Sequence, residues 1–348
     1  MEARSQAVGR RHAVVIGMHR SGTSAVAHSA VELGLSTPDS DDLIAAGPYN
    51  EHGYWESRTI SQFDERVLRH LGGTWSAPPR ISADWEESDD ATMVALRSQA
   101  AELAAASFAR PPMVMKDPRL CLTLPLWRTV LTSEPVAVLV FREPLEVALS
   151  LQERDGFPPT LGLALWHRYV RQSLVSLVGL PVLVVEYARA LNEPHHWVDD
   201  LVAFLGDNGI TPGADRSDQA TRVLAHDLRH HRTATLPVTL ESEQQPLLEI
   251  LRSSLGGHDQ WSIPELPAEP SWVEDVISLT LAGQAVAAAM QAAQQELKWV
   301  KQSRLFRATS ALWRMTGTGP VLSPADEGSD AADSGPNGTA TAAPAAFR

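Results

Sequence analysis

The chain has 348 residues, and its 29 Lys+Arg against 42 Asp+Glu leave a formal net charge of −13 at pH 7. With 44% hydrophobic residues it has enough apolar material for a folded core, which excludes wholesale disorder. The negative charge excludes a general binder of DNA, RNA or anionic lipid, because such partners need a basic face. The single cysteine, Cys121, excludes an internal disulfide framework and a cysteine-based zinc cluster. It lies in an apolar run, which predicts a buried, inert thiol.

The first two hundred residues alternate short apolar runs with helical patterns. We predict strands at 12–16, 113–115, 136–141 and 182–185. Helices are predicted at 22–35, 56–71, 91–107, 120–131, 144–154, 162–177 and 195–205. This alternation predicts an α/β, P-loop-like three-layer fold around a central, mainly parallel sheet. Such sheets bind ligands at the carboxyl ends of their strands.

The pattern weakens after residue 207, and residues 211–219 are predicted to form a loop. A long helix is predicted over 272–303, with roughly heptad spacing of Val276, Leu279, Val286, Met290, Ala293, Leu297 and Val300. Such a helix lies over the core or pairs with another chain. The predicted organisation is a disordered leader (1–11), one domain (12–270), a helical extension (271–315) and a disordered tail (316–348).

The apolar runs in this sequence are short. None of those that we identified reaches the roughly 20 residues of a spanning helix, and the run at 13–17 is too short for a signal peptide. We therefore expect a soluble, cytoplasmic protein without a membrane span.

A glycine-framed loop follows the first predicted strand. It reads Gly17-Met-His-Arg-Ser-Gly-Thr-Ser24, which is the frame G-x-x-x-x-G with Thr-Ser where a Walker A loop has Lys-Ser/Thr. Backbone N–H groups at a helix start, aided by hydroxyls and a cation, form an anion cradle. The candidate anion-binding residues are His19, Arg20, Ser21, Gly22, Thr23 and Ser24. The plainer alternative is a strand-to-helix turn with a capping hydroxyl.

A second basic position ends the strand at 136–141. Arg142 stands at its carboxyl end, and Ser150 follows two helical turns later. Arginine binds phosphate in a bidentate manner, so this pair is a candidate for a second anionic group. Without the first loop, a surface arginine and an unremarkable helix serine would be the better interpretation.

Together these two motifs resemble those of sulfotransferases. Arg20-Ser-Gly-Thr-Ser resembles the family's 5′-phosphosulfate loop, and Arg142 with Ser150 resembles its 3′-phosphate motif. The resemblance implies 3′-phosphoadenosine 5′-phosphosulfate (PAPS) as cofactor and 3′-phosphoadenosine 5′-phosphate (PAP) as product. It covers about residues 12–206. The loop departs from the cytosolic members in carrying Arg20 where they usually have lysine.

Further segments are similar to a bacterial branch of that family found among cell-surface glycan genes. These segments are 50–56 (NEHGYWE), 116–121 (KDPRLC), 154–158 (RDGFP) and 162–166 (GLALW). The resemblance therefore implies that the acceptor hydroxyl belongs to a glycan or a glycosylated metabolite.

Sulfuryl transfer needs a group that takes the acceptor proton. We rank Glu56 first, because aromatic neighbours could raise its pKa; its alternative is an ordinary helix-start glutamate. His52 is second and Glu51 third, and Asp117 is a further candidate that could instead be a structural partner of a neighbouring cation. Lys116 or Arg119 is predicted to stabilise charge on the leaving phosphate or the bridging oxygen.

Two other functions remain open at this point. A P-loop kinase-like phosphotransferase using ATP is disfavoured by the lysine missing after Gly22 and by the lack of a convincing Mg²⁺ aspartate. A non-catalytic partner of a glycan-modifying enzyme is disfavoured by the completeness of both anion motifs. We expect no metal, no nucleic acid beyond the nucleotide cofactor, and self-association or enzyme docking through the long helix.

Overall fold

The computed structural model describes residues 11–48, 50, 53–108, 112–213, 216–226 and 243–302. The chain divides into two compact units, Met1–Thr280 and Leu281–Arg348. The predicted tail, 316–348, and all but the last residue of the predicted leader lie outside the described residues.

The first unit is built on a five-stranded sheet with the order β2-β1-β3-β4-β5. Its strands are β1 (Ala13–Ile16), β2 (Val114–Lys116), β3 (Val136–Phe141), β4 (Val182–Glu186) and β5 (Gly256–His258). The first four pair in parallel, so their carboxyl ends lie along one edge, and β5 runs antiparallel to β4. The predicted α/β class with a mainly parallel sheet is confirmed. The short strand β5 was missed, because its sequence, Gly-Gly-His, has no apolar run.

Helices connect the parallel strands and continue after them. They are α2 (Thr23–Glu32), α3 (Arg58–His70), α4 (Ala91–Ser107), α5 (Leu120–Val130), α6 (Pro144–Asp155), α7 (Pro159–Ser176), α8 (Tyr187–Asn192), α9 (Pro194–Asp207), α10 (Ser217–His226), α12 (Gln245–Ser253) and α13 (Ser271–Gln302). The predicted loop at 211–219 is wrong in its last three residues, where α10 begins. That helix is held by tertiary contacts, since Ala220 and Leu224 are buried and the Ser29 hydroxyl donates to the Ala220 carbonyl.

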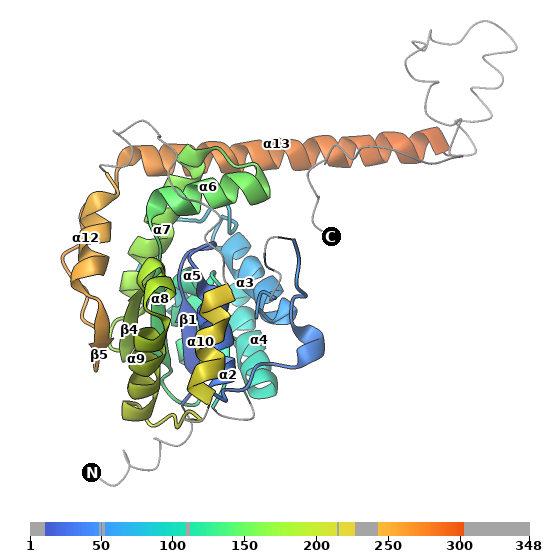
Figure 1. Ribbon diagram of the computed structural model, residues 1–348. Coiled ribbons are helices and arrows are strands. Elements are labelled where there is room, and N and C mark those ends of the chain that lie inside the picture. The colour runs from blue at the N-terminus through green and yellow to red at the C-terminus, as the bar shows by residue number, and fades with distance from the viewer. Residues whose placement is uncertain are drawn as a thin grey trace, which may run out of the picture. The chain divides into compact units, whose positions relative to one another are not determined.

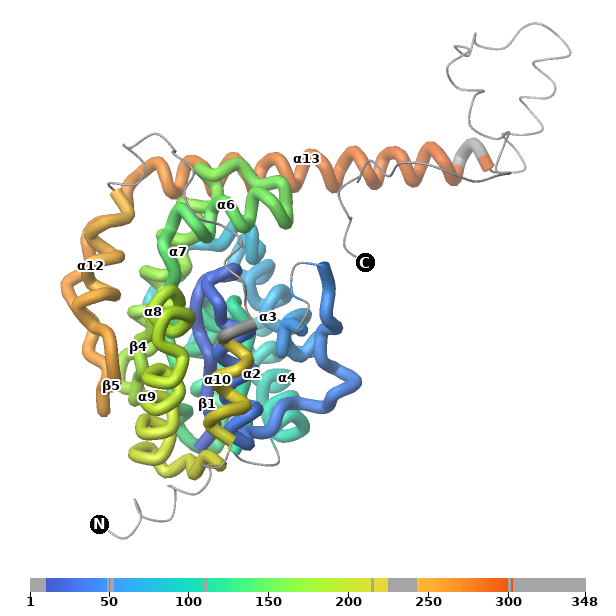
Figure 2. The backbone as a smooth tube through the Cα atoms, in the orientation of Figure 1, coloured from blue at the N-terminus to red at the C-terminus, as the bar shows by residue number. Residues whose placement is uncertain are grey.

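Two apolar cores cover the two faces of the sheet (Figure 1). Val14 and Ile16 of β1 face the core shared with α3 to α7 and α12, whereas Ala13 and Val15 face the core shared with α2, α8, α9 and α10. This alternation is the period-two geometry of a strand buried on both sides. The result is a three-layer arrangement, in which α10 lies alongside α2 although about two hundred residues separate them (Figure 2).

The hairpin of α6 and α7 positions the carboxyl end of β3. A Cβ on Gly162 would lie 2.6 Å from the Ala148 Cα, so only glycine allows the two helices to pack this closely. The Trp166 indole N–H of α7 donates to the Arg142 carbonyl at 3.0 Å. Together these contacts hold Arg142 and Ser150 in one rigid corner of the fold.

The helix α13 is long and apolar. By length and composition alone, Ser271–Trp299 could cross a membrane, with a mean hydropathy of 1.5 and 6% of its most apolar window buried. Our search for continuous apolar runs overlooked it because glutamine, serine and threonine interrupt the apolar residues. A helix that pairs with another helix can have the same length and hydropathy, so the expectation of no membrane span stays a prediction.

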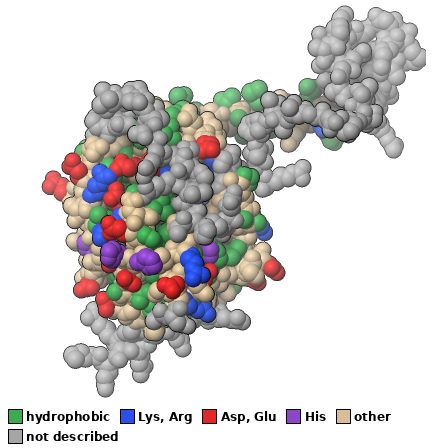
Figure 3. Space-filling view, in the orientation of Figure 1, with side chains coloured by type: hydrophobic (Ala, Val, Ile, Leu, Met, Phe, Trp, Pro, Cys, Tyr) green, Lys and Arg blue, Asp and Glu red, His purple; other side chains and the backbone are tan. Residues whose placement is uncertain are grey.

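Acidic and basic side chains are interspersed on the face of the molecule shown in Figure 3. Among the described residues on that face, no continuous basic patch is visible. The basic side chains that could bind an anion are therefore those at the strand ends, namely Arg20, Lys116 and Arg142.

Candidate active site

The loop between β1 and α2 requires its glycines for different reasons. A Cβ on Gly17 would lie 2.2 Å from the Val140 carbonyl oxygen of the neighbouring strand. Gly22 has a φ of 90°, and a Cβ there would lie 2.1 Å from the Tyr187 ring. Arg20, between them, adopts a φ of 69°, a left-handed conformation that is uncommon for residues with a side chain. The loop therefore folds tightly against the carboxyl ends of β3 and β4.

The start of α2 is suited to an anion. Gly22 is its N-cap and provides no side-chain cap, and the first turn carries no acidic residue. The first backbone N–H groups of a helix have no partner within the helix, and they carry a partial positive charge. The anion cradle at residues 17–24 stays a prediction, and the start of α2 carries no side-chain cap or acidic residue that would oppose it.

The two predicted anion motifs meet in the structure. Arg20 Nε donates to Ser150 Oγ at 2.8 Å, across 130 residues of sequence. Arg142 Nη1 donates to the Arg20 carbonyl at 3.4 Å, and its guanidinium lies 5.5 Å from the centre of the Tyr187 ring. Glu146, one turn into α6, accepts from Arg142 Nε at 2.7 Å. Two arginines from two strand ends are thereby held side by side over the glycine loop.

Lys116, at the end of β2, joins three segments of the site. Its ammonium donates to Ser24 Oγ at 3.1 Å and to the Tyr54 carbonyl at 2.9 Å, and it forms a close ion pair with Glu56. The Ser24 hydroxyl is therefore already engaged inside the fold, where it contacts Lys116 and the Tyr54 carbonyl. Both Lys116 and Glu56 are buried. The first-ranked base and the predicted charge stabiliser are therefore direct partners.

Burial raises the pKa of the Glu56 carboxyl above its ordinary value, and the Lys116 ammonium acts in the opposite direction. A carboxylate with a raised pKa is a stronger proton acceptor than an exposed one, provided that it is ionised. Lys116 favours the ionised form. The ion pair with Lys116 therefore offsets part of the effect of burial on the Glu56 carboxyl.

Asp117 occupies a structural position. Its carboxylate is fully buried and accepts from the Ser61 hydroxyl at 2.5 Å and from the backbone N–H of Arg119 at 2.8 Å. Arg119 Nη1 is also 3.2 Å from it, and Arg119 Nε donates to Glu65 at 3.2 Å. These contacts tie α3 to the end of β2, in agreement with the alternative that Asp117 is a structural partner of a neighbouring cation. His52 and Glu51 lie outside the described residues.

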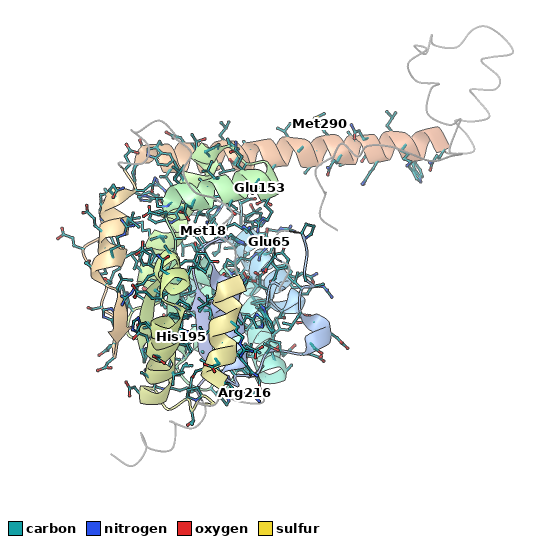
Figure 4. All side chains as sticks on the ribbon, viewed as in Figure 1. Met18, Glu65, Glu153, His195, Arg216 and Met290 are labelled. Carbon is teal, nitrogen blue, oxygen red and sulfur yellow. The ribbon has the colours of Figure 1, made fainter. Side chains whose placement is uncertain are left out.

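His19 has an unusual environment. Its ring packs on Trp75, with centroids 4.6 Å apart, and on Tyr169 at 5.8 Å. Burial lowers the pKa of His19 well below its ordinary value, and the nearby Arg119 and Arg154 lower it further, so the imidazole is neutral at pH 7. Figure 4 shows the neighbouring Met18 on the same side of the unit as Glu65 and Glu153, away from His195 and Arg216.

Two buried polar atoms of the loop have no hydrogen-bond partner among the described residues. They are His19 Nε2 and Ser21 Oγ. An unpaired buried polar group costs about 1–3 kcal/mol, so such atoms in a native fold call for a partner beyond those that the described residues supply. Anionic oxygens bound in the cradle would satisfy both.

Sequence reasoning did not assign roles to Arg154 and Tyr187. Arg154 ends α6, lies 5.5 Å from the centre of the Trp75 ring and pairs with Asp155 at 2.8 Å. Each had a signal, since Arg154 opens the segment 154–158 that resembles the bacterial branch and Tyr187 directly follows a strand. In the described part of the chain, no group of three or more His, Cys, Asp or Glu residues could hold a metal ion.

Comparisons with known proteins give limited information. No family model and no curated protein matches the chain. Among solved structures, it is similar to the sulfotransferase domain from the Synechococcus PCC 7002 olefin synthase, with 16% identity over 78% of this chain and 94% of that chain, and a TM-score of 0.36. It is also similar to the sulfotransferase domain from the curacin biosynthetic pathway, with 13% identity over 77% of this chain and 96% of that chain, and a TM-score of 0.36. These values are too low for either similarity to establish a function.

Proposed function

We propose that the protein is a sulfotransferase that uses PAPS as donor and a hydroxyl group as acceptor. The observation that carries this proposal is the meeting of two arginines from two strand ends above the glycine loop. Arg20 contacts Ser150, and Arg142 contacts the Arg20 backbone. PAPS carries anionic groups at both its 5′ and 3′ positions, and such a ligand needs two adjacent sets of donors.

The residues present fit that ligand. The uncapped start of α2, the Arg20 guanidinium and the unpartnered Ser21 hydroxyl supply donors for the 5′-phosphosulfate. Arg142 and Ser150 supply donors for the 3′-phosphate. An anionic group that inserts between Arg20 and Ser150 replaces a hydrogen bond from the guanidinium to a neutral hydroxyl with contacts in which the donor and the acceptor are both charged.

The proposed chemistry divides among a few side chains. PAPS supplies, when bound, a sulfuryl group attached to a phosphate leaving group. Glu56 accepts the proton of the acceptor hydroxyl as the hydroxyl oxygen attacks, and Lys116 stabilises negative charge beside it. His52 stays the second candidate for the proton acceptor, and His19 Nε2, which has no partner in the described structure, is assigned as a donor to the anion.

We further propose an acceptor from the glycan class, meaning a glycan or a glycosylated metabolite. Its support is the resemblance of four segments to the bacterial glycan branch. All four contribute to the site. Tyr54 and Glu56 contact Lys116, Arg154 lies over Trp75, and the Trp166 indole donates to the Arg142 carbonyl.

ATP-dependent phosphotransfer is the alternative enzyme function. It is opposed by Thr23 at the position of the Walker lysine and by Asp117, whose oxygens are already taken by Arg119 and Ser61.

The first test is ligand-induced thermal stabilisation. PAP is expected to raise the melting temperature of the wild-type chain, and Mg·ATP to raise it little, because a ligand that binds only the native state stabilises it by mass action. Arg20→Ala and Arg142→Ala should abolish the PAP shift. Arg222→Ala is the matched control, since Arg222 is exposed on α10 and should leave the shift unchanged.

The second test is transfer of labelled sulfate from PAPS to a panel of glycans. Stabilisation by Mg·ATP alone would contradict the proposed function. A PAP shift that survives both arginine substitutions would contradict the proposed site and favour a non-catalytic role for the loop. PAP binding with labelling of a different hydroxyl class would retain the enzyme and replace the glycan acceptor.

A further inference from the structure

The helix α13 differs along its length. Its first turns belong to the first unit, where Val273 and Ile277 are buried and Arg168 pairs with Glu274 at 2.7 Å. From Leu281 onwards the helix belongs to the second unit, and its large apolar side chains there are half-buried or exposed. A water-exposed helix without a tertiary partner has little to stabilise it, so this part of α13 needs an explanation.

One set of apolar residues in α13 follows a regular repeat, although Ile277, Leu281 and Trp299 lie off it. Positions alternating by three and four residues are Val276, Leu279, Gly283, Val286, Met290, Ala293 and Leu297, and we call this set the heptad stripe. Leu279, Val286, Met290 and Leu297 are exposed by 75%, 61%, 59% and 54%. The label in Figure 4 marks Met290 on the exposed helix. A 3.5-residue repeat of this kind is the seam of a coiled coil.

The polar residues of the same helix lie off the stripe. They are Ser278, Thr280, Gln284, Gln291, Gln294, Gln295, Glu296 and Lys298. In a bilayer, the amides among them would have to be buried in hydrocarbon, whereas in a coiled coil they lie on the solvent side. This distribution favours pairing with another helix over membrane insertion.

Charge identifies the partner helix. The positions that flank the stripe carry a charge only at its two ends; in order they are Asp275, Thr280, Ala282, Ala287, Ala289, Gln294 and Glu296. Since the whole chain carries −13, two copies repel each other over most surfaces. Along the heptad stripe, two copies would meet without like charges for almost three heptads. The small residues Gly283 and Ala293 would allow the two helices to approach closely. A partner selected by charge would instead require charged flanking positions.

We propose that the protein self-associates as a dimer through a two-stranded coiled coil formed by the heptad stripes of two copies. Each stripe inserts its apolar side chains between those of the other copy, and the glutamines remain in water. The inference is independent of the proposed enzymatic function, because no residue of the candidate active site takes part in it.

The test is analytical ultracentrifugation of the full chain over a range of concentrations. Wild type is expected to be a dimer. Val286→Asp combined with Met290→Asp places two charges in the seam and should raise the dimer dissociation constant by at least about 100-fold. Ala288→Asp combined with Gln295→Asp adds the same charge at exposed positions off the stripe, and this control should remain a dimer.

Three results would overturn the proposal. These are a monomeric wild type at all concentrations, a stripe variant that dimerises like the control, and a wild-type chain that floats with phosphatidylethanolamine–phosphatidylglycerol vesicles while the stripe variant does not. The last result would assign α13 to a membrane. None of the four altered residues is buried, so the first unit should melt at the same temperature in the wild type, the stripe variant and the control.

Discussion

Replacing Glu56 by glutamine separates a catalytic carboxylate from a structural one. Glu56 and Lys116 are a buried ion pair, and removing one charge of such a pair costs about 3–5 kcal/mol of folding stability. Glutamine keeps an acceptor oxygen, and Lys116 retains the Tyr54 carbonyl and Ser24 Oγ. We therefore expect a loss near the lower end of this range, about 3 kcal/mol, measured by denaturant unfolding.

The expected effect on transfer is larger than any effect on binding. A general base contributes about 10²–10⁴-fold to rate, and glutamine cannot accept the proton. The sulfate-transfer rate of Glu56→Gln should fall by that factor while PAP binding persists. In wild type the rate should rise with pH through the pKa of Glu56, which burial raises, because only the ionised carboxylate is a base. That pH-dependent limb should be absent from the variant.

The control is Lys116→Met combined with Glu56→Gln, which removes the pair as a unit. If the loss of stability comes from an unpaired ammonium, the double variant should be more stable than Glu56→Gln alone. A variant Glu56→Gln that is folded, binds PAP and transfers sulfate at the wild-type rate would refute Glu56 as the base. His52→Gln would then be the next variant to assay, because glutamine cannot act as a base.

Three further substitutions or reactions test the structure. Gly22→Ala should abolish PAP binding and lower stability by more than Gly156→Ala, because both glycines have a positive φ and only the first has a ring within 2.1 Å of the added Cβ; melting curves with PAP measure both effects. Burial and the neighbouring Asp117 raise the pKa of Asp64 well above its ordinary value, so its stabilising effect is complete below about pH 4 and is lost as pH rises through the folded pKa. Asp64→Asn should therefore raise the melting temperature at pH 8, with a gain that shrinks toward pH 4, and an equal gain at both pH values would show another cause. Burial raises the pKa of Cys121 to about 12, so a thiol reagent should label it only after unfolding, and rapid labelling of the native chain would show that the thiol is accessible.

The parallel part of the fold could be predicted because its strands are buried on both faces. Such strands are continuous apolar runs, and the predicted range for β3 equals the observed Val136–Phe141. Between residue 207 and helix α13, the elements α10, α12 and β5 contain no continuous apolar run of this kind. Helix α12 has nine residues, and β5 pairs with β4 although two of its three residues are glycine. Their formation depends on tertiary contacts that a local pattern does not contain.

The site was predictable only to the level of its segments. The strand ends directed attention to Arg20, Arg142 and Lys116, because parallel strands place their carboxyl ends together. The pairing of Lys116 with Glu56 spans 60 residues, and no spacing rule predicts it. The contact between Arg20 and Ser150 spans 130 residues and depends on the left-handed backbone of Arg20, which a sequence pattern does not show.

The excess of acidic residues is compatible with an anion site because carboxylates hold the site's cations in place. Glu146 pairs with Arg142, four residues before it in the chain, and Glu56 pairs with Lys116, 60 residues after it. Without these partners, the burial of several cations around one loop would be opposed by mutual repulsion and by the loss of hydration. Each carboxylate offsets that cost while it fixes the direction of its cation. An anionic ligand then meets donors that are already oriented, so the acidic partners contribute to the pre-organisation of the site even though they carry the ligand's own sign of charge.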